Sequence, residues 1–99
     1  MSIVILHEAA EEEMADAISW YESKEQGLGT RLRREIEAAI SKIQQRPNSY
    51  QLVKGSKVRR ILIDKFPYSI FYIIDEDQIF VISVFHTSRN PLIWHDRVN

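Results

Sequence analysis

The sequence predicts an α+β fold in which a two-helix hairpin packs on an antiparallel sheet, in the order β-α-α-β-β-β. Apolar runs of strand length follow one another between residues 58 and 86. Two stretches between residues 9 and 46 carry apolar residues at helical spacing, and glycines separate them. The chain has 99 residues, so we expect one domain that spans residues 1–99.

Four stretches are expected to be strands. Residues 3–6 form a short apolar run whose partner must lie far along the chain, and VRRILID, YSIFYIID and QIFVISVFH follow between residues 58 and 86. Glu76 and Asp77 join the last two runs, as in a tight antiparallel hairpin. Both faces of residues 78–86 are largely apolar, which predicts a central strand. The first strand and the strand with Arg60 are expected at or near edges, where a disordered partner can add a strand.

Two amphipathic helices are expected between the first strand and the others. The first runs from Ala9 to about Ser23, and Gly27 is placed to end it in a left-handed conformation. Thr30 is a candidate N-cap for the second, which should stop before Pro47. Their apolar stripes are expected to face each other and the sheet. These stripes consist of Ala10, Met14, Ala17, Ile18, Tyr21, Leu32, Ile36, Ala39, Ile40 and Ile43.

The remaining segments carry turn signals. Residues 47–57 are polar and contain glycine, serine and asparagine, which predicts a surface loop with Tyr50 and Leu52 as anchors. Asn90 and Pro91 are typical of a helix start, so residues 92–97 are expected to form a short helix or an extended tail docked by Trp94.

Composition excludes several classes of protein. Without cysteine the chain can form no disulfide framework, thiolate nucleophile or cysteine-based zinc site. No apolar run approaches the ~20 residues that span a bilayer, and residues 3–6 are too few for a signal peptide, so we expect a cytoplasmic protein with no membrane partner. Phosphate loops and nucleophile elbows are absent, and His86, His95 and Asp96 lack a metal-binding spacing. No cofactor or metal is therefore expected.

Charge is polarised along the chain although the net charge is −1. Residues 1–26 hold seven acids and one base, and residues 27–60 hold nine bases and two acids. A near-neutral total does not favour attraction of the whole molecule to nucleic acid. Either a local basic patch binds a partner, or the acidic first helix and the basic second helix offset each other.

Candidate functional residues lie in the second half of the chain. Arg59 and Arg60 are adjacent on a strand and should project to opposite faces, one paired with an acid such as Asp64 or Asp75 and the other free to bind a phosphate or carboxylate. His86 is either a proton carrier or a histidine satisfied within the fold. Exposed cationic and aromatic groups, typical of interaction hot spots, are supplied by Arg89, Trp94 and Arg97.

These residues carry a resemblance that covers nearly the whole chain. Residues 58–97, with the acidic stretch 9–23 and the helix at 27–47, resemble the RelE/ParE superfamily of toxins from type II toxin–antitoxin systems. The most specific pieces are the Arg59-Arg60 pair, FPYSIFY at 66–72 and the segment from His86 to Arg97. The resemblance implies a compact α+β fold. It also implies a cognate antitoxin whose disordered tail wraps the toxin, with a heterotetramer as the complex.

The superfamily divides by target. RelE-like members are similar to ribosome-dependent mRNA endonucleases, which need proton-transferring groups and cations at the scissile phosphate. Here Leu62, Ser69 and Thr87 stand where lysine or arginine would be expected. The chain resembles the ParE branch better, through FPYSIFY and SRNPLIW, and members of that branch inhibit DNA gyrase by binding.

The resemblance therefore implies a gyrase inhibitor without a catalytic residue. Its expected target-binding residues are Arg59, Arg60, Arg89, Trp94 and Arg97. Two alternatives stay open. One is a RelE-like mRNA endonuclease that acts on the ribosome through Arg60, His86 and Arg89, and the other is an inactive relative that only binds its antitoxin.

Overall fold

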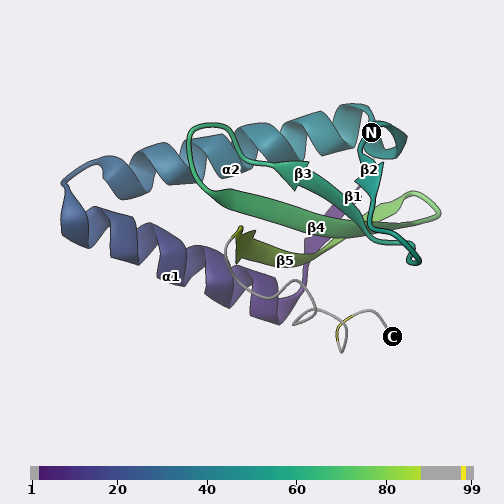
Figure 1. Ribbon diagram of the computed structural model, residues 1–99, viewed down its shortest axis with the longest axis horizontal. Helices are drawn as coiled ribbons and strands as arrows, with labels where there is room; N and C mark the ends of the chain where they lie inside the picture. The colour runs from purple at the N-terminus through teal and green to yellow at the C-terminus, as the bar shows by residue number, and fades with distance from the viewer. Residues whose placement is uncertain (1–2, 88–96, 98–99) are drawn as a thin grey trace.

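The computed structural model describes residues 3–87 and residue 97, and it has the expected α+β architecture. Two helices lie side by side and cover one face of a five-stranded sheet (Figure 1). The elements in order are β1 (Ile3–Leu6), α1 (Glu8–Lys24), α2 (Leu28–Gln45), the 3₁₀ helix η1 (Pro47–Ser49), β2 (Gln51–Leu52), β3 (Arg59–Leu62), β4 (Tyr68–Asp75) and β5 (Gln78–His86). Neither α1 nor α2 has the length and apolar composition that a membrane span requires.

The sheet has the strand order β1-β5-β4-β3-β2. Strands β2 to β5 are antiparallel neighbours, and β5 is an interior strand, as the sequence predicts. Strand β1 pairs with β5 in parallel, with Ile3 opposite Gln78 and Leu6 opposite Val81. A parallel pair needs a long crossover, and the chain from α1 to β4 provides it. The expected first strand is confirmed at the edge of the sheet, while the two-residue strand β2 was not expected within residues 47–57.

The start of α2 differs from the prediction. The expected N-cap at Thr30 is wrong: α2 begins at Leu28, and Gly27 precedes it with φ 89°, the left-handed conformation expected for this glycine. The cap comes from α1 instead. One carboxylate oxygen of Glu22 accepts the Gly27 N–H at 2.9 Å, and the other accepts the Gly29 N–H at 3.0 Å. Glu22 thus stabilises the first turn of α2, where the helix dipole favours negative charge.

The main core lies between the helices and the sheet. The helices contribute the stripes that the helical spacing predicts, with Leu32, Ile36 and Ile43 of α2 fully buried. A second cluster lies on the other face of the sheet, where Val58, Phe71, Ile82 and Phe85 are buried. Both faces of β5 are therefore apolar, which explains its position inside the sheet.

Residues 47–50 are fixed to the sheet by two polar side chains. The Tyr72 hydroxyl donates to the Pro47 carbonyl at 2.7 Å, and the Arg59 guanidinium donates to the carbonyls of Tyr50 at 2.7 Å and Asn48 at 3.2 Å. The expected pairing of an arginine with Asp64 or Asp75 is therefore wrong, because Arg59 binds backbone carbonyls instead. The Leu52 side chain is not the buried anchor that was expected, because 46% of the residue is exposed.

Burial raises the pKa of Tyr72 to about 12, with Arg59 opposing the shift and Tyr50 adding to it. The neutral hydroxyl is the form the fold stabilises. The contribution of Tyr72 to stability is thus complete below its unfolded pKa of about 10 and is lost as pH rises toward 12. We expect the free energy of unfolding to fall by about 2 kcal/mol between pH 10 and pH 12. Urea unfolding at several pH values in this range measures the decrease. The Tyr72→Phe variant should not show it.

Candidate functional site

Strand β5 changes its surroundings halfway along its length. Phe71 lies opposite Ser83, but Tyr72 lies opposite Val81, so Ile82 is an extra residue in the β4–β5 ladder. Pairing with β1 ends at Val81, whose carbonyl accepts the His7 N–H at 2.8 Å. From Ile82 onward the outer edge of β5 therefore faces α1, and its backbone groups need other partners.

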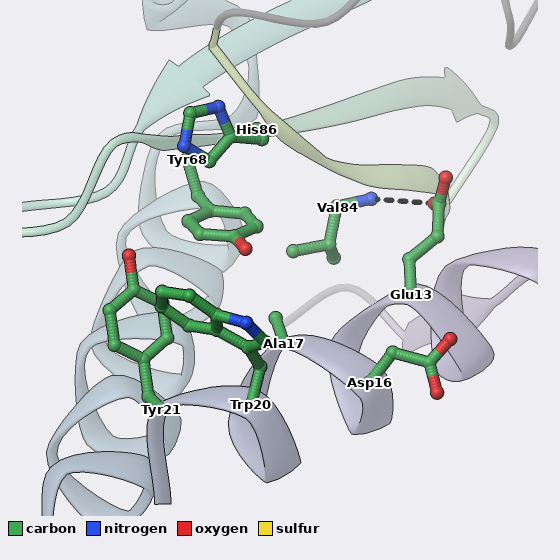
Figure 2. Close-up of a pocket in the computed structure, with 8 residues that line it drawn as sticks. All are labelled: Glu13, Asp16, Ala17, Trp20, Tyr21, Tyr68, Val84 and His86. Carbon is green, nitrogen blue, oxygen red and sulfur yellow. Dashed lines mark hydrogen bonds between the residues drawn. The ribbon is translucent and has the colours of Figure 1, made fainter. Parts of the chain in front are cut away.

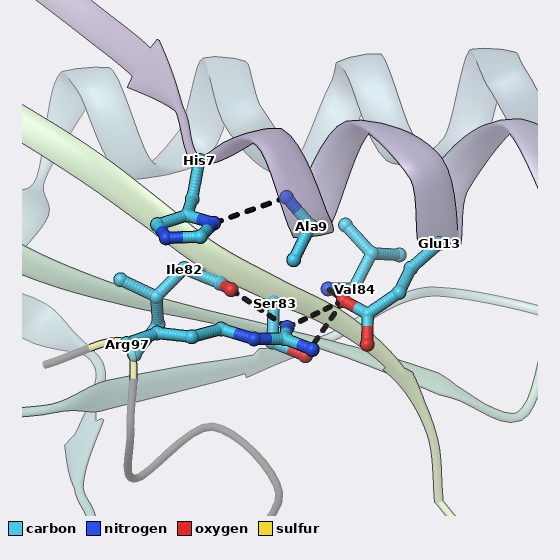
Figure 3. Close-up of polar contacts among 7 residues, drawn as sticks. All are labelled: His7, Ala9, Glu13, Ile82, Ser83, Val84 and Arg97. Carbon is cyan, nitrogen blue, oxygen red and sulfur yellow. Dashed lines mark hydrogen bonds and ion pairs between the residues drawn. The ribbon is translucent and has the colours of Figure 1, made fainter.

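Glu13 of α1 and Arg97 supply those partners. The Glu13 Oε1 atom accepts from the Ser83 hydroxyl at 3.0 Å, from the Val84 N–H at 3.1 Å and from Arg97 Nη1 at 2.9 Å (Figure 3). The same Arg97 nitrogen donates to the Ile82 carbonyl at 3.0 Å. Both side chains are only 16% exposed. We call this group the Glu13 hub, and it replaces the strand neighbour that β5 lacks here.

A pocket of about 430 Å³ lies beside the Glu13 hub, between α1 and the ends of β4 and β5. Figure 2 shows its two sides. Rings gather on one side, and the carboxylates of Glu13 and Asp16 lie on the other, with Ala17 and Val84 between them. The rings belong to Trp20, Tyr21, Tyr68 and His86. The pocket thus joins an aromatic wall to an acidic wall.

The rings of the aromatic wall hold one another in place. Tyr21 makes edge contacts with Trp20 at 4.9 Å and with Tyr68 at 6.2 Å between ring centroids, and Tyr68 meets His86 at 5.2 Å. Edge-to-face contacts of this kind are favourable and directional. Tyr21 is anchored further by Phe66, at 5.2 Å. We infer that the aromatic wall is formed before any partner arrives.

The described members of the expected target-binding set do not lie together. Arg59 is turned toward the helix side and is bound to carbonyls, whereas Arg60 is exposed on the opposite face with Nη2 3.5 Å from Gln51 Oε1. Arg60 lines a smaller hollow of about 200 Å³ beside β2. The expectation of an exposed Arg97 is wrong, because Glu13 and a backbone carbonyl bury it. Arg89 and Trp94 lie outside the described residues.

The two residues of the alternative catalytic set that are described lie on opposite faces of the sheet. Arg60 is paired in register with Phe71, and His86 with Tyr68. Because residues 68 and 71 of one strand point to opposite sides, Arg60 and His86 do as well. His86 lies in the aromatic wall on the helix side. One phosphate cannot contact both side chains.

Residues that line the pocket were mostly missed from the sequence. The sequence counts Glu13 and Asp16 only among the seven acids of residues 1–26, and it indicates no role for Trp20. One signal was available. Trp20 falls outside the apolar stripe of α1 and is 54% exposed, and a large aromatic residue on the polar side of a helix often marks a binding surface.

Ion pairs do not join the two helices. In the described part of the chain, Glu35 pairs with Lys65 at 3.8 Å and Glu13 with Arg97 at 2.9 Å, and neither pair connects α1 to α2. Within the described residues, the exposed acids of α1 are therefore not offset by ion pairs from α2. Within the described residues, no group of three histidine or acidic side chains is placed to hold a metal ion.

Solved structures of two kinds of toxin–antitoxin protein resemble the fold. A chain from the chromosomal ParDE system of P. aeruginosa superposes with a TM-score of 0.73 at 13% identity, covering 89% of this chain and 98% of that chain. A chain from the intact E. coli RelBE complex gives 0.67 at 22% identity, covering 90% and 100%. The isolated E. coli RelE toxin gives 0.66 at 20% identity, covering 98% and 96%. At such identities these likenesses establish the fold alone.

The sequence itself decides the family. No curated protein matches the chain. The family model described as the ParE toxin of the type II toxin–antitoxin system parDE matches residues 4–91, a span that begins within β1 and extends past β5. The chain therefore belongs to the ParE family of type II toxin–antitoxin toxins.

Proposed function

We propose that this toxin acts in the cytoplasm by binding DNA gyrase and inhibiting it, and that a cognate antitoxin neutralises it. The observation that carries the proposal is the separation of Arg60 from His86 by the sheet. Cleavage of mRNA would need a cation and a proton-transferring group at one phosphate. Inhibition by binding needs no such arrangement, and membership of the ParE family agrees with it.

Positions expected to be cationic in a ribonuclease support the same proposal. Leu62 is apolar and 61% exposed, whereas Ser69 is buried, with 2% of the residue exposed. Thr87 carries no charge and uses its N–H on the Pro67 carbonyl at 2.8 Å. None of the three can supply a positive charge to an RNA backbone.

The proposed target surface is the exposed region around Arg60, on the face of the sheet opposite the helices. Arg89 and Trp94 remain proposed contacts of the same kind. Arg59 and Arg97 are assigned a supporting role, because their guanidinium groups already bind carbonyls or Glu13 within the chain. The antitoxin is proposed to form a heterotetramer with the toxin.

Two assays on the purified toxin test the proposal together: supercoiling of plasmid DNA by gyrase, and mRNA cleavage in a translating extract. We expect loss of supercoiling with intact mRNA. Arg60→Gln should raise the concentration for half-inhibition about tenfold, the effect of losing a hot-spot arginine. The control Arg33→Gln removes the same charge from the exposed side of α2 and should change it less than about twofold.

The other outcomes have distinct meanings. Cleaved mRNA with normal supercoiling would replace the proposal with a RelE-like endonuclease, and His86 would be the first residue to substitute. No effect in either assay and no growth inhibition on induction would identify a relative that only binds its antitoxin. If Arg60→Gln and Arg33→Gln raised the concentration for half-inhibition equally, the target surface would lie elsewhere.

A further inference from the structure

We infer that the pocket between α1 and the ends of β4 and β5 is a receptor for one cationic side chain, an arginine by preference, carried by the antitoxin. The inference rests on the proposed function, because it assigns the pocket to the antitoxin instead of the target. It concerns a site on the helix side of the sheet, opposite the face that carries Arg60.

The acidic wall supplies the charge. Asp16 is exposed on α1 and forms no ion pair with any described residue, so its carboxylate is available to a partner. Glu13 lies one turn earlier, and its described hydrogen bonds all use Oε1. A cation entering the pocket would meet the Asp16 carboxylate and lie near a second negative group, in a site partly shielded from water.

The aromatic wall supplies the surface on which a cation stacks. The Trp20 indole is 54% exposed, and indole is the ring that attracts cations most strongly. The chain already shows this attraction, because Lys24 places its Nζ 5.0 Å from the centroid of the same ring. Lys24 itself does not line the pocket.

A guanidinium group fits both walls at once. Its flat face stacks on an aromatic ring while its edge donates two parallel hydrogen bonds to a carboxylate, which an ammonium group cannot do. The volume of about 430 Å³ exceeds what one side chain occupies, so the flanking peptide would enter as well.

Charge complementarity identifies the antitoxin as the occupant. Around the pocket α1 carries further exposed acids, Glu11 and Glu12, that no described ion pair neutralises. A basic residue on an antitoxin segment would therefore be attracted to this face and then fixed by the pocket. The basic α2 lies beside α1. An antitoxin segment that carries both basic and acidic residues would therefore bind the two helices in one orientation.

The first test uses the toxin alone, labelled with ¹⁵N, and two probes: N-acetyl-arginine methylamide and N-acetyl-citrulline methylamide. Citrulline keeps the shape of arginine but lacks its charge. We expect the arginine probe to shift the Trp20 indole N–H resonance, assigned with Trp20→Phe, in a saturable way. The citrulline probe should bind at least about fivefold more weakly, as a lost cation–π contact and ion pair imply.

A matched pair of variants locates the binding. Asp16→Asn should abolish most of the preference for arginine, whereas Glu11→Gln removes the same charge from α1 outside the pocket and should preserve it. Both positions are exposed, so neither change should unfold the protein. Equal responses to arginine and citrulline, or an arginine response unaffected by Asp16→Asn, would overturn the inference.

The second test uses the toxin–antitoxin complex purified after co-expression. If an antitoxin side chain fills the pocket, the arginine probe should no longer shift the Trp20 resonance. A complex that responds like the free toxin would overturn the assignment to the antitoxin. Neither test involves gyrase, so a failure of the proposed inhibition would be recognised separately from a failure here.

Discussion

Glu13→Ala is expected to lower the free energy of unfolding by about 3 kcal/mol, because it leaves several polar groups without an acceptor at once. The Val84 N–H, the Ser83 hydroxyl and the Arg97 guanidinium all donate to the same Glu13 oxygen. The carboxylate is 16% exposed, so water can replace it only in part. Urea unfolding monitored by circular dichroism measures the change.

Two comparisons make this result specific. Glu12→Ala removes a neighbouring exposed carboxylate and should change stability by less than about 0.5 kcal/mol. Arg97→Met should cost less than Glu13→Ala, because Glu13 keeps its bonds to Ser83 and Val84 when Arg97 is removed. A Glu13→Ala variant as stable as Glu12→Ala would contradict the role assigned to the Glu13 hub.

Gly29→Ala is expected to destabilise the protein by about 2 kcal/mol, although alanine normally stabilises a helix by about 1 kcal/mol relative to glycine. A Cβ atom at this position would lie 2.6 Å from the Ile18 carbonyl oxygen and 3.0 Å from the Glu22 Cβ atom. The first of these is backbone, so α1 and α2 must move apart. The shift would also disturb the Glu22 carboxylate that caps α2.

Thr30→Ala provides the control for the same helix. Thr30 is exposed and lies inside α2 instead of capping it, so alanine should leave stability unchanged or raise it by a few tenths of a kcal/mol. A loss of about 1 kcal/mol would instead indicate the N-cap that the sequence suggested. Chemical denaturation of both variants under one set of conditions gives the sign for each position.

Elements with strong patterns could be predicted from the sequence, and those fixed by distant side chains could not. The boundaries of β4 and β5 agree with the apolar runs at 68–75 and 78–86. The start of α2 was misplaced because its cap is Glu22, a residue of the preceding helix. Strand β2 is two residues long and shows no alternation, so no pattern could reveal it.

The candidate site shows the same difference between what a sequence pattern predicts and what depends on packing. Arg60 and His86 were chosen by residue type, and strand alternation alone placed Arg59 and Arg60 on opposite faces. The separation of Arg60 from His86 depends on the register across β3, β4 and β5, which the sequence does not display. Asp16 and Trp20 join the site only through the way α1 docks on β5, so the pocket required the structure.

The parallel pairing of β1 with β5 has a consequence for how the protein folds. The helical hairpin and the β2–β5 meander join elements that are neighbours in sequence. Strand β1, in contrast, pairs with a strand far along the chain, with Ile3 opposite Gln78. Closing so long a loop is slow, and we expect it to be a late step of folding. During synthesis the Glu13 hub and the pocket cannot form until β5 is complete. An antitoxin that binds the pocket as we propose would therefore recognise only a toxin chain that is nearly finished.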